Sequence, residues 1–489
     1  MLFNSFEFIC IFFPLVTGLY FLLPHRWRWL LLLVASCWFY MTFVPVYILI
    51  LAFTILVDYF AGIWIEQSEG RRRKLLLTAS IFANVGVLAF FKYFNFLNES
   101  IAEVVRGLGF HYGVPDLGII LPIGLSFHTF QSLSYTIEVY RKHQAAERRV
   151  GIFALYVMFY PQLVAGPIER PGNLLNQINS TTPGTGMRAK FDYGRVVEGL
   201  RQMLWGFFKK VVIADRCAVV VDQVYGAPEH YGALSIALAT YLFAVQIYCD
   251  FSGYTDIALG AARVMGFNLM VNFRTPYLSK NISEFWSRWH ISLSSWFRDY
   301  LYIPLGGNRV VKWRWYYNLM IVFLVSGLWH GADWTYVIWG GLHGSYLILA
   351  LVFAPLMLRF TKGIGLDRLP SLKKWLNIFI TVQLVSFAWI FFRANSIHDA
   401  ATLVHRLFNT PWALDDLRML LADLPRSMLD FTVLLVIAFM AMDPLFDAWA
   451  KRDRPVPKGL VGATLYAAVL VGILLFGYFG STSFIYFQF

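Results

Sequence analysis

Apolar runs of about twenty residues recur from one end of this 489-residue chain to the other. Such a run matches the hydrocarbon core of a bilayer, which an α-helix crosses in about 20 residues. The composition agrees, since 58% of the residues are hydrophobic and only 14% are charged. A soluble domain does not have this composition. The sequence therefore predicts an all-α polytopic membrane protein, with one integral-membrane domain over residues 1–489.

The apolar runs give the approximate bounds of the predicted membrane spans. They lie near Phe6–Leu23, Trp29–Phe43, Val44–Ile65, Leu75–Leu97, Leu117–Tyr140, Gly151–Ile168, Ile236–Leu259, Trp315–Trp329, Thr335–Leu356, Trp375–Phe392, Met428–Trp449 and Leu460–Phe479. Several segments in the middle of the chain need not cross the bilayer fully.

The net charge of +12 does not indicate a nucleic-acid partner, because the basic residues lie in short loops between the spans. Arg26 and Arg28 follow the first span, "RRRK" at 71–74 follows the third, and "RKHQAAERR" at 141–149 follows the fifth. By the positive-inside rule these loops face the cytoplasm and the N-terminus faces away from it. The same rule makes "GGNRVVKWRW", residues 306–315, a cytoplasmic loop.

Residues 281–303 are too polar to span a membrane but are strongly patterned. At about 100° per residue their aromatic side chains share one arc, while serines, Arg298 and Asp299 fill most of the opposite side. Asn281 is a predicted N-cap, and Pro304 ends the run. The pattern predicts one amphipathic helix, with His290 at the seam between its two faces.

A second histidine, His330, stands in "SGLWHGADW" at the end of an apolar run. The run from Trp315 to Trp329 would extend only about 22 Å as a helix, so we expect the helix to break at "HGAD". Non-helical backbone at membrane depth lines a cavity or is buried in protein, and an ionisable residue there is a functional-site candidate. Gly327 and Gly331 would allow a ligand or another backbone to approach the imidazole closely.

Structural roles remain open for these residues when spacing alone is considered. His330 fits a packing role as well as a catalytic one, and His290 and His343 are weaker candidates. We expect no metal site, since neither His290 nor His330 belongs to an H-x-x-x-H pair. Asp250 and Asp256, in "YCDFSGYTDIALG", could orient a histidine or line a polar cavity, although a structural hydrogen-bonding role is the commoner one.

Several blocks together resemble the membrane-bound O-acyltransferase superfamily, most of all its bacterial branch typified by the alginate O-acetyltransferase. They are "EFWSRWHISLSSWFRDYLYIPLGGNR" (284–309), "SGLWHGADWTYVIWGGLHG" (326–344), "DFSGYTDIALG" (250–260), "LVAGPIERP" (163–171), "LPIGLSFHTFQSLSYTIEVYR" (121–141) and "FIYFQF". The resemblance implies a ring of transmembrane helices with re-entrant and interfacial amphipathic helices around a central channel. It also implies a catalytic core over about 117–356 and C-terminal accessory spans over about 373–489.

The resemblance implies that His330 is the catalytic residue and His290 the second histidine of the active site. Imidazole suits the deprotonation of an acceptor hydroxyl, so we assign His330 as general base. We assign His290 to positioning the acyl group or the acceptor, or to stabilising the oxyanion. The predicted substrate-binding residues are Asp250, Asp256, Trp289, Arg298, Asp299, Trp329, Arg309 and Lys312. Arg309 and Lys312 would hold the phosphates of the donor.

The donor implied by the resemblance is acetyl-CoA, a substrate and not a bound cofactor. We expect a multi-pass protein of the bacterial inner (cytoplasmic) membrane that serves the O-acetylation of an extracytoplasmic polysaccharide such as alginate. Loops on the outer face are short, the longest being about 98–116, so we expect a separate acetyl carrier or polysaccharide acetyltransferase as partner. A D-alanyl or other acyltransferase and a transporter-like acyl-handling protein are the alternatives.

Overall fold

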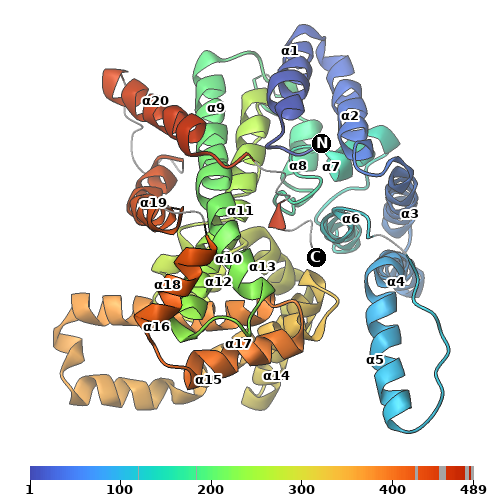
Figure 1. Cartoon of the computed structure of the whole chain (residues 1–489). Helices are drawn as coiled ribbons and strands as arrows, with labels where there is room; N and C mark the ends of the chain where they lie inside the picture. The colour runs from blue at the N-terminus through green and yellow to red at the C-terminus, as the bar shows by residue number, and fades with distance from the viewer. Residues whose placement is uncertain (119–120, 183, 425–427, 451–458, 480–483, 486–489) are drawn as a thin grey trace. The chain divides into compact units, whose positions relative to one another are not determined.

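The computed structural model describes the chain apart from residues 119–120, 183, 425–427, 451–458, 480–483 and 486–489 (Figure 1). The described residues form helices and contain no strand, which confirms the predicted all-α fold. The first α-helices are α1 (Phe13–Leu22), α2 (His25–Met41), α3 (Ile48–Gln67), α4 (Gly70–Leu88), α5 (Phe94–Gly107), α6 (Leu125–Tyr140), α7 (Val150–Met158), α8 (Leu174–Ile178), α9 (Tyr193–Phe207), α10 (Asp215–Gly226) and α11 (Ala233–Met265). The others are α12 (Ile282–Arg288), α13 (Ile291–Phe297), α14 (Lys312–His330), α15 (Trp334–Gly363), α16 (Pro370–Arg393), α17 (Ile397–Asn409), α18 (Leu414–Asp423), α19 (Met428–Ala450) and α20 (Gly459–Phe476). Short π-helices continue several of these, namely η1 (Glu7–Phe12), η3 (Ala89–Tyr93), η5 (Phe208–Ala214) and η7 (Arg298–Tyr302).

Seven helices of the described chain are long and apolar enough to cross a membrane. They cover Pro45–Gln67, Gly70–Gly107, Ala233–Met265, Trp334–Gly363, Pro370–Arg393, Met428–Ala448 and Gly459–Phe476. Each coincides with a predicted span, so the multi-pass prediction is confirmed. The first predicted span, Phe6–Leu23, corresponds to a shorter apolar helix, Glu7–Leu22.

The predicted span Gly151–Ile168 is wrong, because α7 ends at Met158. Phe159 leaves the helix with ψ 114°, two residues before Pro161. A proline disfavours the helical conformation in the residue that precedes it, so the helix stops before this position. The apolar run then continues as a series of turns instead of a membrane-spanning helix.

The predicted span Leu117–Tyr140 is too long at its N-terminal end. The helix α6 begins at Leu125, directly after Gly124, whose φ of 76° is left-handed. A Cβ atom on Gly124 would lie 2.9 Å from the carbonyl oxygen of Leu163. A close backbone approach and a glycine conformation therefore set the start of this helix.

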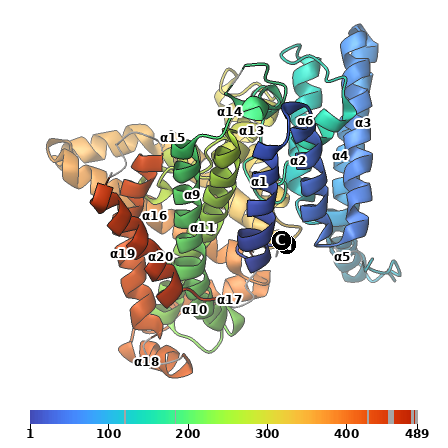
Figure 2. The same cartoon turned by 90° about the horizontal axis from the view of Figure 1, so that it is seen from above.

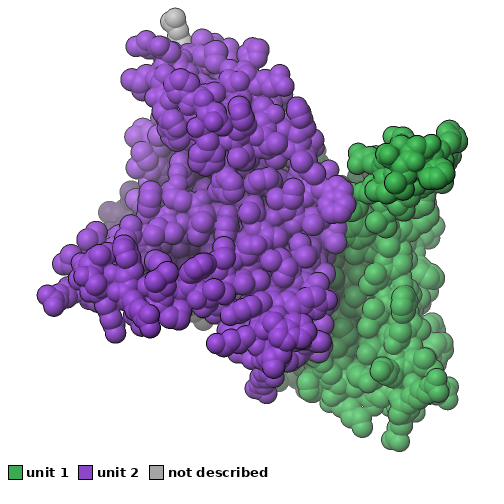
Figure 3. All heavy atoms as spheres, turned by 90° about the horizontal axis from the view of Figure 1, so that it is seen from below, with its two compact units in different colours: residues 1–204, 254–270, 486–488 green, residues 205–253, 271–485, 489 purple. Residues whose placement is uncertain are grey.

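The chain folds into two compact units, coloured in Figure 3. Unit 1 contains residues 1–204 and 254–270, and unit 2 contains residues 205–253 and 271–485. The long helix α11 contributes its N-terminal part to unit 2 and its C-terminal part to unit 1. Both candidate histidines, His290 and His330, lie in unit 2.

In unit 1 the helices α3, α4 and α6 lie side by side (Figures 1 and 2). They meet around Asp58, which is completely buried. Its carboxylate accepts hydrogen bonds from Ser80 Oγ at 2.6 Å, from Asn84 Nδ2 at 2.9 Å and from the Ser132 hydroxyl. A buried polar group is tolerated when it is hydrogen-bonded, so this cluster joins the three helices.

In unit 2 the helices α14 and α15 form a tightly packed hairpin. A Cβ atom on Gly327 would lie 2.2 Å from the carbonyl oxygen of Tyr336, and one on Gly340 would lie 2.3 Å from that of Phe323. These two glycines therefore allow the helix backbones to touch. The helix α16 packs against α15 and closes one side of the aromatic cluster that surrounds the histidines.

Candidate active site

The amphipathic helix predicted over residues 281–303 is interrupted at His290. Its start is as predicted, since Asn281 caps α12 by accepting the backbone N–H of Glu284 at 2.8 Å. The helix α12 ends at Arg288, and His290 adopts a left-handed conformation with φ 43° and ψ 54° before α13 begins. The prediction of one continuous helix is therefore wrong.

The break has its cause in the loop before α12. The backbone carbonyl of Asn272 accepts the N–H of Ile291 at 2.9 Å, and its side-chain Oδ1 accepts the N–H of Ser292 at 3.1 Å. The first amides of a helix have no partner within that helix, so an outside residue that binds them supports a new helix start. The sequence prediction missed Asn272, which lies 18 residues before His290 in an irregular loop without a local signal.

The His290 imidazole is completely buried, and because the helix is interrupted at this residue, the predicted position at a seam between two faces of one helix is wrong. Its ring centroid lies 4.7 Å from that of Phe251 and 6.0 Å from that of Trp329, both in edge-on contact. Its Nδ1 lies 3.2 Å from Asn272 Oδ1. Burial lowers the pKa of His290, so its ring is neutral near pH 7.

His330 is the last residue of α14, which confirms the predicted break at "HGAD". The helix is longer than predicted, since it begins at Lys312 and its 19 residues extend about 28 Å. Asp333 caps α15 by accepting the N–H of Thr335 at 2.7 Å. This turn directs the chain back along α14.

The buried imidazole of His330 lies among aromatic rings from three helices. Its ring centroid is 4.9 Å from that of Trp329, 5.0 Å from that of Trp339 on α15 and 5.4 Å from that of Phe392 on α16. A Cβ atom on Gly327 would lie 2.2 Å from the carbonyl oxygen of Tyr336, so this glycine allows a close backbone approach to α14, and the predicted approach to the imidazole itself stays a prediction. Thus the helix termini fix the backbone of His330 and the aromatic rings fix its side chain.

One indole connects the two histidines. The Trp329 ring lies 6.0 Å from His290 and 4.9 Å from His330, measured between centroids. Residues 40 positions apart in the sequence thus come together within unit 2. A third imidazole, His343, is completely buried in the same cluster, with its ring centroid 5.1 Å from that of Trp339.

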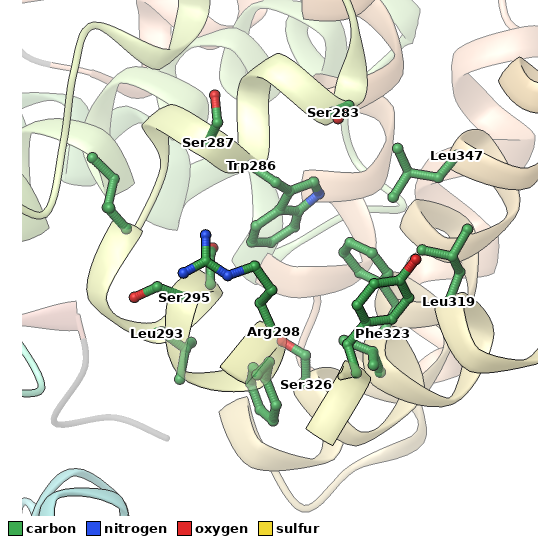
Figure 4. Close-up of a pocket in the computed structure, with 15 residues that line it drawn as sticks. Ser283, Trp286, Ser287, Leu293, Ser295, Arg298, Leu319, Phe323, Ser326 and Leu347 are labelled. Atoms are coloured by element: carbon green, nitrogen blue, oxygen red, sulfur yellow. The ribbon is translucent and has the colours of Figure 1, made fainter. Parts of the chain in front are cut away.

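A groove of about 370 Å³ opens beside this cluster, and α12, α13, η7, α14 and α15 line it (Figure 4). Its walls are mostly apolar, with Trp286 and Phe323 among them. Arg298 contributes a cation and pairs with Asp299 at 2.8 Å between Nε and Oδ1. Ser326 lines the groove one helical turn before His330, and mostly apolar walls with a few polar groups suit a largely apolar ligand.

Asp250 belongs to a buried group of charges in unit 2, which we call the Lys210 cluster. Lys210 Nζ lies 2.6 Å from Asp250 Oδ1 and 2.8 Å from Asp215 Oδ1. The other oxygen of Asp250, Oδ2, accepts the backbone N–H of Ile485 at 2.7 Å. Both carboxylate oxygens bind groups of the chain itself, and the predicted contact of Asp250 with substrate stays a prediction.

The remaining predicted residues lie in different surroundings. Trp289 is buried in the aromatic cluster, 5.2 Å from Trp389 between centroids. Asp256 lies in unit 1, where it accepts a hydrogen bond from Gln202 Nε2 at 2.9 Å. Arg309 and Lys312 are exposed between η7 and the first turn of α14, where a charged ligand can reach them.

Residues 76–390, which contain both histidine blocks and Asn272, match the family model of the membrane-bound O-acyltransferases. This chain belongs to that family. It is therefore a multi-pass membrane O-acyltransferase, and the resemblance inferred from its motifs is confirmed.

Individual relatives agree with this membership. The chain is 38% identical over 466 residues to the probable alginate O-acetylase AlgI of Pseudomonas putida, covering 94% of this chain and 90% of the relative. It is 33% identical over 434 residues to the peptidoglycan O-acetyltransferase of Helicobacter pylori, covering 82% and 78%. It is 31% identical over 302 residues to the teichoic acid D-alanyltransferase of Streptococcus thermophilus, covering 55% and 68%.

Proposed function

We propose that the chain moves an acetyl group from cytoplasmic acetyl-CoA across the bacterial inner membrane for O-acetylation of an extracytoplasmic polysaccharide, alginate or a similar polymer. The observation that carries the proposal is the position of Trp329, whose ring contacts both His290 and His330. Acetyl transfer is favoured over D-alanyl transfer because similarity to the alginate O-acetylase covers 94% of the chain, against 55% for the D-alanyltransferase.

In the proposed reaction the His330 imidazole accepts the proton of the acceptor hydroxyl while the hydroxyl oxygen attacks the thioester carbonyl carbon. A C–O bond forms, the tetrahedral intermediate collapses and the C–S bond breaks. The imidazolium then gives its proton to the leaving thiolate, which leaves as the free CoA thiol. A hydroxyl pKa far above neutral makes a general base necessary, and imidazole has a suitable proton affinity.

The groove of Figure 4 is the proposed site of the donor's extended arm. It runs along α14 from Leu319 to Ser326, and the helix places Leu319 and His330 about 16 Å apart along its axis. The thioester could thus reach His330 while the charged part of the donor remains outside. Arg309 and Lys312 would bind the donor phosphates there, and Arg298 would contact the arm within the groove.

The acceptor would approach from the opposite face of the membrane. A polymer that stays outside the bilayer cannot reach a buried imidazole directly, and His330 is only 4% exposed. We therefore propose an extracytoplasmic acetyl carrier or polysaccharide acetyltransferase as partner. In that scheme a hydroxyl of the partner, instead of one of the polymer, is the group that His330 deprotonates.

Purified protein in liposomes tests the donor. With radiolabelled acetyl-CoA on one side and a small alcohol as acceptor, we expect label in the alcohol ester or released slowly as acetate. A His330→Ala protein, inserted to the same level, is the control. Equal label release by both proteins, or transfer from a D-alanyl thioester alone, would overturn the proposal.

A further inference from the structure

One atom of the Asn272 side chain, Oδ1, accepts three hydrogen bonds. It accepts the backbone N–H of Ser292 at 3.1 Å and the hydroxyl of Ser292 at 2.8 Å. The same oxygen lies 3.2 Å from His290 Nδ1. Asn272, Ser292 and His290 are all completely buried, so water does not compete for these bonds.

The backbone amide of Ser292 determines which end of the Asn272 side chain faces this group. A backbone N–H can only donate, so it requires the carbonyl oxygen and excludes the NH₂ group at this position. An oxygen of this kind only accepts, and the nitrogen of His290 that faces it must carry a proton. In the neutral imidazole this places the proton on Nδ1 and leaves the lone pair on Nε2.

The backbone of the same loop holds Asn272 in place. The Ile291 N–H donates to the Asn272 carbonyl at 2.9 Å, and the Arg274 N–H donates to the Arg288 carbonyl at 2.9 Å. These bonds lie on either side of His290, whose left-handed conformation is uncommon for a residue with a Cβ atom. Conformations of this kind persist where the surrounding contacts fix them, and they concentrate at functional sites.

We infer that Asn272 is a positioning residue that keeps the proton of His290 on Nδ1 and makes Nε2 a hydrogen-bond acceptor. The tautomer follows from the geometry alone, and its consequence for catalysis rests on the proposed function. With a hydrogen-bond acceptor at Nε2, His290 can position a substrate through an N–H or O–H group other than the hydroxyl proton that His330 takes. The neutral ring cannot donate from Nε2 to a developing oxyanion, so the inference decides between the two roles that the sequence left open.

Solid-state NMR of the full-length protein in lipid vesicles tests the tautomer directly. Histidine labelled with ¹³C and ¹⁵N allows each ring nitrogen to be identified, because Nδ1 is bonded to Cγ and Nε2 to Cδ2. The signal of His290 is the one that disappears in His290→Gln. We expect its proton on Nδ1 at neutral pH. A proton on Nε2, or on both nitrogens, would overturn the inference.

Variants of Asn272 test whether this residue is what keeps the His290 proton on Nδ1. Asn272→Asp keeps an oxygen acceptor and should retain the Nδ1 proton, whereas Asn272→Leu removes the acceptor and should lose that preference. Asn318→Leu is the matched control, since Asn318 is equally buried in unit 2 and donates instead to the carbonyls of Leu305 and Gly307. It should leave the His290 tautomer unchanged. A Nδ1 proton that persists in Asn272→Leu would contradict the assignment.

Turnover measured in the same Asn272 variants tests the effect on catalysis. We expect turnover to fall by roughly tenfold or more in Asn272→Leu, because the imidazole is no longer held in one orientation, and to recover in part in Asn272→Asp. If Asn272→Leu does not fold, the wild-type spectrum and Asn272→Asp still decide the tautomer. A correct tautomer in a protein that does not transfer acetyl groups would refute the proposed function and leave the positioning role intact.

Discussion

His290 and His343 are both completely buried in one aromatic cluster, yet their surroundings place the ring proton on opposite nitrogens. His290 Nδ1 faces the Asn272 oxygen at 3.2 Å, whereas His343 Nδ1 accepts the indole N–H of Trp286 at 3.3 Å. An indole N–H only donates, so neutral His343 carries its proton on Nε2. Two equally buried histidines therefore differ in their acceptor nitrogen, which is Nε2 in His290 and Nδ1 in His343.

The comparison of His290 with His343 shows that the hydrogen-bond partner of Nδ1, and not desolvation, determines which ring nitrogen donates and which accepts. The Nδ1 lone pair of His343 is used within the protein, in a contact that also orders the Trp286 and Trp339 rings around it. His290 instead donates from Nδ1 and has its acceptor atom at Nε2. We therefore expect His290 to act in the reaction and His343 to act in packing.

The largest expected effect is the loss of turnover in a His330 variant. The effects of substitutions at His290 and His343 are compared with that loss. His330→Ala removes the proposed base, so turnover should fall by at least about 100-fold while the protein still folds and inserts. Polymer O-acetylation in cells and label transfer in liposomes measure the loss. Normal acetylation by a well-expressed variant would show that His330 is not the base, and the roles proposed for His290 and His343 relative to it would lose their basis.

The exposed cations Arg309 and Lys312 are predicted to bind the donor, so removing them should weaken donor binding without changing the protonation of the buried histidines. Losing a charge-assisted contact costs about 1.5 to 3 kcal/mol, so Arg309→Ala with Lys312→Ala should raise the acetyl-CoA KM more than tenfold with little change in kcat. The His290 and His343 tautomers should be the same as in the wild type. An unchanged KM would return both residues to a role in membrane topology.

His343 is the direct test of the packing role. His343→Phe leaves the Trp286 indole N–H without its acceptor, which should reduce stability by about 1 to 3 kcal/mol. Turnover should stay within about threefold of wild type. His343→Gln restores an oxygen acceptor and should recover part of the thermal stability measured in detergent. A loss of turnover comparable to that of His330→Ala would mean that His343 shares in the chemistry.

The smallest change concerns one hydrogen bond. Trp286→Phe keeps an aromatic ring but removes the indole N–H, so His343 should lose its preference for the Nε2 proton, at a cost of about 1 kcal/mol. The His290 tautomer should not change, since Asn272 is untouched. The labelled-histidine spectrum measures both rings in one sample. If both tautomers shift together, the two partners do not act independently.

The parts of the site that depend on local pattern could be predicted from the sequence. The apolar runs locate the long spans, and the short polar interruption "HGAD" locates the end of α14 at His330. Asn281 could be recognised as a helix cap because its acceptor and the capped N–H lie three residues apart. These features need only neighbours in the sequence.

The features that depend on tertiary contacts could not be predicted. The aromatic arc continues through His290, so periodicity indicates one helix where the structure has two. Only the fold brings Asn272 to the start of α13, and only the fold pairs Asp250 with Lys210. The prolines and glycines that shortened two spans were visible in the sequence, but the strength of their effect depended on backbone contacts.

The Lys210 cluster also sets an order of events during synthesis. Lys210 and Asp215 precede Asp250 in the chain, whereas Ile485, which donates to Asp250 Oδ2, follows it by 235 residues. At about 5 to 20 residues per second, roughly 10 to 50 s separate the synthesis of that carboxylate from the synthesis of its last partner. Each new molecule therefore passes through a form in which Lys210 and both carboxylates have been synthesised but Ile485 has not, so Asp250 Oδ2 cannot yet accept its amide.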